Sequence, residues 1–398
     1  MIRSALIAIF VAAGALLLVV RSVPAEEAPS YTWDLPPGFP VPLVPDDNPM
    51  TAARTELGRF IFYDERLSGN GTTSCATCHR QELAFTDGRP RAVGSTGQTH
   101  PRGAMSLANV AYNTTLTWAD PEVRRLEHQA MVPMFNETPV ELGVAGNEQE
   151  ILRRFRDDPD YPRMFREAFP ATEGDPVTIE NVVRAIAAFE RTLISGNSPY
   201  DRLVYHGEMD ALDEAARRGM RLFFSDRLRC SECHAGFNFG GPVVFEGSGP
   251  IEPTFHNTGL YNVGDTGEYP SDNPGLYGST GVEEAMGRFR APTLRNIAVT
   301  APYMHDGSIA TLADVVDVYA AGGRLVPSGP YRGDGRANPY KSERIAGFDL
   351  TARQRDDLLR FLESLSDTDF LADPRLSDPR VLDCARVTSW SRTGSVAD

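Results

Sequence analysis

The chain has 398 residues, and 41% of them are hydrophobic, which is enough for two or three domains with buried cores. Its formal net charge of −15 argues against a nucleic-acid partner, because phosphates require a basic surface. The 35 Gly and 30 Pro residues predict long loops between compact helices.

The N-terminal residues have the pattern of an export signal. Residues 1–3 form a short basic start, the apolar run 5–20 follows, and residues 23–25 offer small side chains for cleavage. We expect residues 1–25 to be removed, and a retained anchor is the alternative because the run nearly spans a bilayer. No second run of that length follows, so we expect a periplasmic protein without stable membrane insertion after cleavage.

A repeated segment divides the chain into two parts. "GRFIFYDERL" at residues 58–67 and "GMRLFFSDRL" at 219–228 share a Gly, an apolar stretch with Phe, an acidic residue and Arg-Leu. Both look helical, and each precedes a Cys-x-x-Cys-His motif. This order predicts two related units in tandem, at 31–195 and 196–372, followed by a tail at 373–398.

Three further helices are predicted from apolar periodicity. They span residues 178–195, 311–319 and 351–366. Each opens with a threonine that can cap the first turn, and in the last helix Gln354 completes a capping box. Strand signals are sparse, and residues 236–287 are rich in Gly, Pro, Asn and Asp without periodicity. We therefore predict a mainly α fold with long ordered loops.

Four of the five cysteines lie in the two Cys-x-x-Cys-His motifs, and Cys384 has no assigned partner or function. Zinc is a poor fit, because a His directly after a Cys is badly placed to ligate the same ion. A thioredoxin-like dithiol needs a βαβ setting that the sequence lacks. Covalent haem c uses every residue, since the thiols add to the vinyl groups and the His coordinates iron. The residues predicted to hold the two haems are Cys75, Cys78, His79, Cys230, Cys233 and His234.

The ligand on the opposite face of each iron separates an electron carrier from an enzyme. A haem with two protein ligands carries electrons, whereas an open haem binds peroxide or oxygen. Tyr319 lies on the apolar face of the 311–319 helix. A buried Tyr on such a face is most often a packing residue, but a phenolate is also a known haem ligand. The residues alone leave both interpretations open.

Motifs in a fixed order resemble the bacterial di-haem cytochrome c peroxidase and MauG superfamily over about residues 57–365. In chain order, beside the haem motifs, they are "SLANVAYN" (106–113), "LTWAD" (116–120), "EHQAMVPMFNETPVELG" (127–143) and "FRAPTLRNIAVTAPYMHDGSIATL" (289–312). The resemblance implies two tandem cytochrome c-like domains, each with one covalent haem c. It also implies that the first haem reacts with hydrogen peroxide.

The resemblance implies roles for individual residues. Tyr319 matches the distal ligand of the second haem, which is Met in the peroxidases and Tyr in MauG. Gln129 and Glu141 match distal polar residues of the first haem, although the spacing to Glu141 is two residues longer than usual. Pro133 matches the residue over the open iron face, and Trp118 matches the Trp between the haems.

Two further positions follow from the same resemblance. The side chain of Asn109 and the backbone carbonyls of Thr300 and Pro302 match a calcium site between the domains, and oxygen ligands suit Ca²⁺. Some peroxidases close the first haem with a loop His. His100 precedes Pro-Arg, unlike the peroxidase pattern, so we expect a surface His and an open iron.

Shorter segments narrow the resemblance to the MbnH group of MauG-like enzymes. They include "LPPGFP", "SCATCHRQELAFTDGR", "RTLISGNSPYDR" and "FHNTGLYN". The group implies that peroxide gives a bis-Fe(IV) state that oxidises a Trp to kynurenine in a secreted copper-binding protein, MbnP. The alternatives are a cytochrome c peroxidase fed by a small cytochrome or cupredoxin, and a non-catalytic electron carrier. MauG has a surface Trp before its second haem motif, whereas residues 227–229 here are Arg-Leu-Arg. The sequence therefore does not indicate by which residues oxidation leaves the protein.

Overall fold

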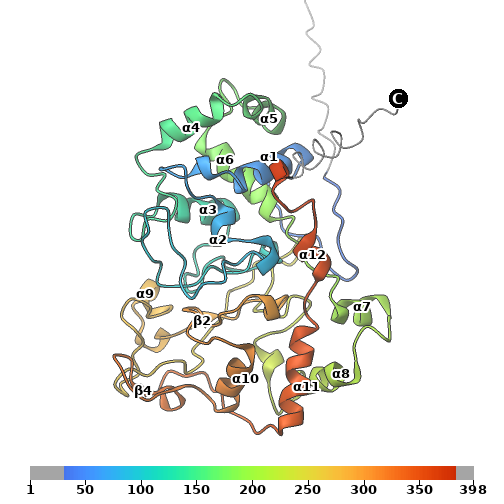
Figure 1. Cartoon of the computed structure of the whole chain (residues 1–398), viewed down its shortest axis with the longest axis vertical. Coiled ribbons are helices and arrows are strands. Elements are labelled where there is room, and N and C mark those ends of the chain that lie inside the picture. The colour runs from blue at the N-terminus through green and yellow to red at the C-terminus, as the bar shows by residue number, and fades with distance from the viewer. Residues whose placement is uncertain (1–30, 382–398) are drawn as a thin grey trace, which may run out of the picture.

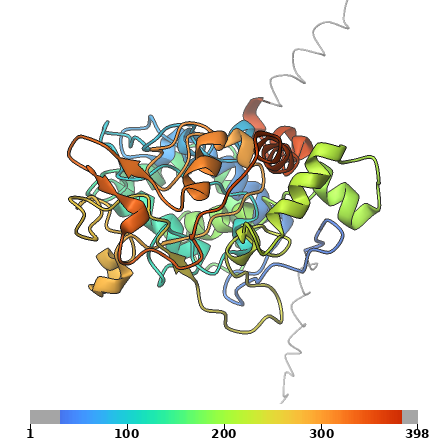
Figure 2. The same ribbon diagram turned by 90° about the horizontal axis from the view of Figure 1, so that it is seen from below.

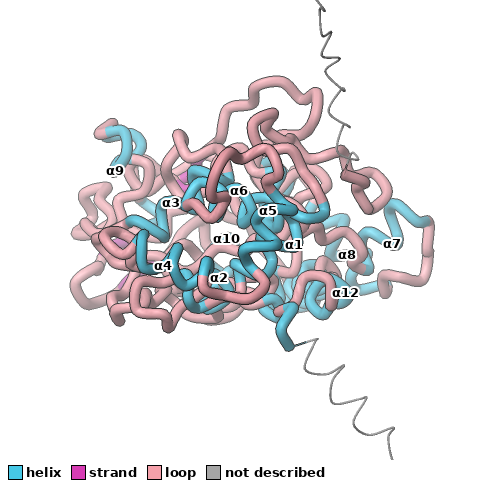
Figure 3. Tube along the Cα trace, turned by 90° about the horizontal axis from the view of Figure 1, so that it is seen from above, coloured by secondary structure: helices cyan, strands magenta, loops and turns pink. Residues whose placement is uncertain are grey.

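The computed structural model describes residues 31–381, so the predicted signal peptide and Cys384 lie outside the described residues. Long loops connect short helices and two pairs of very short strands, which confirms the mainly α prediction (Figure 1 and Figure 3). The elements are α1 (Ala52–Phe62), α2 (Cys75–Cys78), α3 (Leu126–Phe135), α4 (Glu148–Arg156), α5 (Tyr161–Ala168), α6 (Ile179–Glu190), α7 (Pro199–His206), α8 (Glu214–Phe223), β1 (Phe255–His256), α9 (Tyr277–Thr280), β2 (Phe289–Arg290), α10 (Leu312–Ala320), β3 (Leu325–Val326), β4 (Gly333–Asp334), α11 (Ala352–Glu363) and α12 (Thr368–Ala372).

The three predicted threonine caps are all present. The hydroxyls of Thr178, Thr311 and Thr351 each accept a hydrogen bond from the backbone N–H three residues later. They open α6, α10 and α11, and they satisfy donors that the first helical turn leaves free. Helix α6 is shorter than predicted and ends at Glu190, because the N–H of Thr192 turns back to the carbonyl of Phe189 over 2.8 Å.

The repeated segment corresponds to a repeated helix crossing. In the first unit α1 crosses α6 at Gly58, where a Cβ atom would lie 1.9 Å from the carbonyl oxygen of Ala185. In the second unit α8 crosses α11 at Gly219, where a Cβ atom would lie 1.9 Å from the carbonyl oxygen of Asp357. Only glycine permits so close an approach of two backbones. The predicted tandem organisation is confirmed, with one crossing in each half of the molecule (Figure 1).

Three hydrophobic clusters form the core. One belongs to the helices of the first unit, and a second lies between α8, α10 and α11. The third joins segments of both units, and Trp118 packs against it from the first unit. Its buried members are Ala119, Leu260, Tyr261, Tyr269, Phe289, Tyr303 and Ile309. This third cluster places Trp118 at the junction of the two units.

The chain after α11 returns to the first unit. Phe370 of α12 and Leu376 are buried in the core of the first unit, and the side-chain amide of Gln81 donates to the carbonyl of Phe370 over 3.1 Å. Residues 366–381 therefore pack with the first unit, although the sequence placed residues up to 372 in the second. Seen from below, α7 and α8 lie beside α11 at one end of the molecule (Figure 2).

A buried ion pair ties α7 to the loop that lines the larger cavity described below. The guanidinium of Arg295 binds both carboxylate oxygens of Asp201, at 2.8 and 2.9 Å, and both side chains are fully buried. Asp201 also accepts from the N–H and hydroxyl of Ser198, which completes a capping box on α7. Within residues 31–381, no helix is long and apolar enough to cross a membrane.

Candidate functional site: two cavities with one Cys-x-x-Cys-His motif each

Each Cys-x-x-Cys-His motif lies in the wall of its own cavity. The first cavity lies in the first unit and is lined by Cys75, Cys78, His79, His100, Gln129, Pro133, Glu141 and Glu190, with apolar neighbours. The second cavity is larger and is lined by Cys230, Cys233, His234, Trp118, Arg290, Met304, His305 and Tyr319, among others. The six residues predicted to hold haem are thus divided between two cavities as the two motifs require.

Both motif histidines are held with one ring nitrogen facing away from the backbone. The Nδ1 atom of His79 lies 2.7 Å from the carbonyl oxygen of Phe85, and a carbonyl can only accept, so this nitrogen carries the proton. The Nδ1 atom of His234 lies 3.1 Å from the carbonyl of Pro292 and 3.2 Å from that of Phe239. Such a bond fixes the tautomer and leaves Nε2 as the ligating atom.

Burial keeps both imidazoles neutral. It lowers the pKa of His79, and it lowers the pKa of His234 to about 4. A neutral imidazole is the form that coordinates a metal. The two histidines are therefore ready to act as ligands without losing a proton.

The four motif cysteines are free thiols rather than activated thiolates. Burial raises the pKa of Cys78 to about 11 and that of Cys230 to about 12, and it also raises the pKa values of Cys75 and Cys233. A zinc site or a dithiol redox motif would need the thiolate stabilised by nearby positive charge. In the described chain, no three His, Cys, Asp or Glu side chains converge on a metal-binding point. Both observations fit thiols that add to haem vinyl groups.

The second cavity also offers partners for the anionic edge of a haem. The side chain of Arg290 lines its wall, its buried Nε atom has no hydrogen-bond partner, and burial lowers its pKa to about 10. A buried N–H of a cation without a partner is costly, and a carboxylate such as a haem propionate would satisfy it. The residues of this cavity therefore fit a covalent haem.

The distal wall of the first cavity is built by α3 and the loop after it. Gln129 and Pro133 are four residues apart on α3 and both face the cavity. The N–H of Leu142 donates to the carbonyl of Pro133 over 2.9 Å, and this bond brings Glu141 against the same cavity. The longer spacing before Glu141 is thus absorbed in the loop. Burial raises the pKa of Glu141 to about 7, so its carboxyl group can exchange a proton near neutral pH.

Two residues of the first cavity differ from the sequence expectation. His100 is not a surface residue: it is half-buried in the cavity wall, and its Nδ1 accepts from the N–H of Arg102 over 3.1 Å. Glu190, which sequence reasoning missed, is buried at the end of α6 with its Oε2 atom unpaired. Burial raises the pKa of Glu190 to about 8. The signal in the sequence is an acidic residue at the end of a helical stretch, "VVRAIAAFE", that is apolar apart from Arg184.

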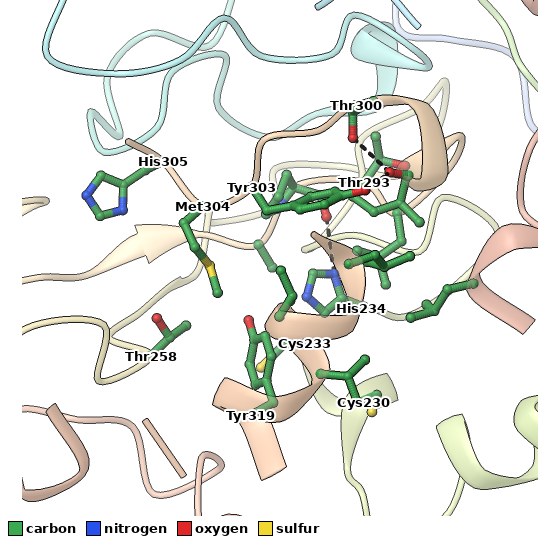
Figure 4. Close-up of a pocket in the computed structure, with 18 of the residues that line it drawn as sticks. Cys230, Cys233, His234, Thr258, Thr293, Thr300, Tyr303, Met304, His305 and Tyr319 are labelled. Carbon is green, nitrogen blue, oxygen red and sulfur yellow. Dashed lines mark hydrogen bonds between the residues drawn. The ribbon is translucent and has the colours of Figure 1, made fainter. Parts of the chain in front are cut away.

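Tyr319 and His234 enter the same cavity, as Figure 4 shows. The Tyr319 side chain comes from α10, and burial raises its pKa because the phenolate would lose its hydration. The thioether of Met304 points into the same space (Figure 4), and Met304 has a left-handed backbone with φ of 71°. Arg227 and Arg229 also line this cavity, at the position where the sequence lacks a surface Trp.

Trp118 belongs to the first unit and packs at the junction of the two units. Its indole N–H donates to the carbonyl of Gly103 over 3.1 Å, and its side chain lines the second cavity. The segment 85–89 divides the cavities, since Phe85 holds His79 while the four residues after it line the second cavity. Trp118 therefore belongs to the wall of the second cavity, and its place between the two haems stays a prediction.

The three predicted calcium ligands come from both units, Asn109 from the first and Thr300 and Pro302 from the second. The side-chain amide of Asn109 is buried and exchanges two hydrogen bonds with the backbone of Ser195, at 2.8 and 3.0 Å. Thr300 and Pro302 lie instead in the wall of the second cavity. The Asn109 amide thus fastens the start of the interdomain segment, and a calcium site here stays a prediction.

Comparisons with known proteins agree with this arrangement. The family model described as "Di-haem cytochrome c peroxidase" matches residues 52–210. "Cytochrome-c peroxidase IdrP1" of Denitromonas iodatirespirans is 35% identical over 380 residues, which cover 90% of this chain and 95% of that protein. "Methylamine utilization protein MauG" of Methylorubrum extorquens is 33% identical over 321 residues, which cover 81% of this chain and 80% of that protein.

A solved structure resembles the whole fold. It is described as the crystal structure of a MauG-like protein associated with microbial copper homeostasis, and it is 48% identical to this chain. The TM-score is 0.86, and the match covers 88% of this chain and all of that chain. The diheme peroxidase BthA from Burkholderia thailandensis shares the fold, with a TM-score of 0.60 at 19% identity.

Proposed function

This chain belongs to the di-haem cytochrome c peroxidase and MauG family, and on that premise we propose that it uses hydrogen peroxide to oxidise a side chain of a partner protein. Family membership makes it an oxidoreductase and implies two haem c groups. The finer proposal is that a Trp of a secreted, copper-binding, MbnP-like protein becomes kynurenine. We also propose that the mature chain acts in the periplasm.

The observation that supports the proposal is that Tyr319 and His234 line one cavity. A phenolate is a hard anionic ligand that favours oxidised iron, whereas a thioether favours reduced iron and raises the potential. When bound, the two haems supply the oxidising chemistry and share the two equivalents that one peroxide delivers. As a ligand, Tyr319 would favour the oxidised state of the second haem. That state suits storage of oxidising equivalents, whereas a peroxidase needs a second haem that readily accepts electrons.

In the first cavity the chain's own residues move the proton that peroxide cleavage requires. The carboxylate of Glu141 takes a proton from the near oxygen of peroxide and returns it to the far oxygen, which leaves as water. The Gln129 amide orients the peroxide by hydrogen bonding, and Pro133 would offer no ligating atom to the iron of a haem held in this cavity. All three side chains line one wall.

Trp118 supplies the step between the sites in this proposal. Its indole is easily oxidised, and it lines the second cavity at the junction of the two units. A hydrogen bond to the Gly103 carbonyl fixes the ring in place. Trp118 therefore passes an electron from the second site to the first without moving.

The partner is proposed from similarity to the MauG-like protein associated with copper homeostasis. Covalent oxidation of a protein side chain needs no substrate pocket that reaches the iron, because electrons travel through the enzyme. A secreted copper-binding protein produced together with this chain is the natural test substrate. After peroxide is added to both proteins, the modified Trp is found by mass spectrometry of the partner's peptides.

A second candidate function is reduction of peroxide with electrons from a small cytochrome or cupredoxin. It is favoured by one observation, the placement of His100 in the wall of the first cavity, where a loop His could close the iron. Several relatives carry the name of such peroxidases.

One experiment separates these functions. Stoichiometric peroxide is added to the purified diferric protein, and optical and Mössbauer spectra are recorded. We expect both iron sites to respond without prior reduction. A response only after one haem is reduced would favour the peroxidase, and no response in either state would refute both.

A further inference from the structure

We propose that a line of aromatic residues, Trp118, His305, Tyr269, Tyr261 and Tyr331, carries electrons from the protein surface to the second cavity. This inference rests on the proposed function, because peroxide must first supply the oxidant held at the haems. The Arg-Leu-Arg segment at 227–229 has no readily oxidised side chain, so the aromatic line would take the place of the surface Trp as the exit route for oxidation.

The line begins in the wall of the second cavity. Trp118 and His305 both line this cavity, and their ring centroids are 6.5 Å apart. The centroid of the His305 ring lies 6.4 Å from that of Tyr269. The His305 ring is also stacked on Phe289 at 3.7 Å, and burial lowers its pKa to about 4, so no positive charge interrupts the path.

The outer half of the line consists of tyrosines. Ring centroids are 5.6 Å apart between Tyr269 and Tyr261 and 5.7 Å apart between Tyr261 and Tyr331. Tyr269 and Tyr261 are buried, whereas Tyr331 is half-buried in the turn between β3 and β4. Phenol and indole are among the most easily oxidised side chains, so short steps between them favour transfer one electron at a time.

A carboxylate beside Tyr261 makes its oxidation feasible. The phenol of Tyr261 donates a hydrogen bond to Oδ2 of Asp306 over 2.7 Å. When Tyr261 loses an electron toward the cavity, its phenolic proton moves to Asp306, and a neutral radical remains. When Tyr331 returns an electron, the proton moves back from Asp306. Tyr331 is partly exposed, so its phenolic proton passes to solvent water when it loses the electron and returns when a partner side chain supplies one.

The surroundings favour Tyr261 over Tyr269 as the site that holds the radical. Although burial opposes it, hydrogen bonds from Tyr261 and Ser308 lower the pKa of Asp306, so its carboxylate is ionised and can accept a proton. The phenol of Tyr269 instead meets Oδ1 of Asn257 at 2.8 Å, and an amide is a very weak base.

The outer end of the line is accessible to a partner protein. Beside Tyr331 in sequence, the side chain of Arg332 is 61% exposed, and Leu325 of the paired strand β3 is 53% exposed. A partner side chain placed here donates its electron to Tyr331, and two such transfers reduce the oxidant left by one peroxide. The partner's oxidation therefore needs no contact with either haem.

The relay can be tested on the holoenzyme with peroxide alone. The protein is treated with stoichiometric peroxide and a nitroso spin trap, and adducts are mapped by peptide mass spectrometry. We expect the adduct at Tyr331. In Tyr261→Phe it should fall at least tenfold, and in Asp306→Asn the tyrosyl radical detected by electron paramagnetic resonance should fall as well. The matched control is Tyr277→Phe on α9, which lies outside the line and is also partly exposed; it should leave the adduct at Tyr331 unchanged.

The outcomes separate the relay from the proposed function. If peroxide changes the haem spectrum but the adduct lies away from Tyr331, or persists there in Tyr261→Phe, the relay is refuted and the proposed function stands. If peroxide leaves the spectrum of the unmodified protein unchanged, the proposed function fails, and the relay falls with it. Tyr331→Phe gives an independent check, because a half-buried surface phenol can be removed without loss of folding.

Discussion

Leu142 donates its backbone N–H to the carbonyl oxygen of Pro133 across 2.9 Å, and this bond joins the loop after α3 back onto the helix. A second bond of the same length, from the N–H of Val144 to the carbonyl of Met134, continues the contact. Glu141 is therefore fixed on the wall that Gln129 and Pro133 form, although it lies twelve positions after Gln129 in the printed sequence.

Glu141→Gln should slow the reaction with peroxide by about 100-fold, the typical contribution of a positioned acid-base group. In the unmodified protein the ionised carboxylate accepts the proton, so the rate should rise with pH through about 7, the pKa of Glu141. The variant should lose this pH dependence. Stopped-flow absorbance between pH 5 and 9 provides the measurement.

Glu137→Gln is the matched control, because Glu137 is exposed in the same loop and does not line the cavity. It should keep both the rate and the pH profile. An unchanged pH profile in Glu141→Gln would remove Glu141 from the proton path.

Tyr319→Phe should change the optical and electron paramagnetic resonance spectra of one haem only, because the phenol oxygen is lost from the second cavity. The matched control is Tyr303→Phe. Tyr303 lines the same cavity, but its hydroxyl donates to the carbonyl of Ile297 over 3.1 Å. If both variants leave the spectra unchanged, Tyr319 is a packing residue.

Glu190→Gln should make the protein more stable at pH 8 and should change little at pH 4. The pKa of Glu190 in the folded protein, about 8, is above the ordinary value of 4.5. Between these two pH values Glu190 is ionised in the unfolded chain but protonated in the folded protein. The free energy of unfolding therefore falls as pH rises through this range. The gain at pH 8 should be roughly 2 to 5 kcal/mol. Denaturant unfolding of the holoprotein at both pH values measures it.

Glu180→Gln on the same helix is the control, since its side chain is 67% exposed and pairs with Arg184. It should alter stability by at most about 0.5 kcal/mol at either pH. Equal effects of the two substitutions would contradict the burial argument.

Arg295→Met should destabilise the protein by about 3 to 5 kcal/mol, because Asp201 is left charged and fully buried without its partner. An exposed pair provides the comparison. Arg163 and Glu167 lie four residues apart on α5 with more than half of each side chain exposed, so Arg163→Met should cost about 0.5 kcal/mol or less. Urea unfolding of both variants measures the difference. Similar losses of unfolding free energy in the two variants would contradict the prediction that breaking the buried pair is more destabilising than breaking the exposed one.

Local patterns in the sequence determined much of the architecture. The Cys-x-x-Cys-His motifs identified the two haem sites because attachment depends on covalent spacing over five residues. The threonine caps at 178, 311 and 351 marked the helix starts, since capping acts within one turn. The repeat predicted two units, and Gly58 and Gly219 explain why it persists: each permits the same helix crossing.

Only the tertiary structure decided which distant residues share a cavity. Glu190 and His100 join the first cavity from separate segments, and a sequence pattern carries no signal for that meeting. The Asn109 amide bonds to the backbone of Ser195, a contact between residues 86 positions apart that the sequence does not indicate. The aromatic line from Trp118 to Tyr331 depends on packing between loops of the third hydrophobic cluster. Helices and covalent motifs form through contacts between near neighbours in the chain, whereas cavity walls and aromatic contacts form only when loops from both units pack together.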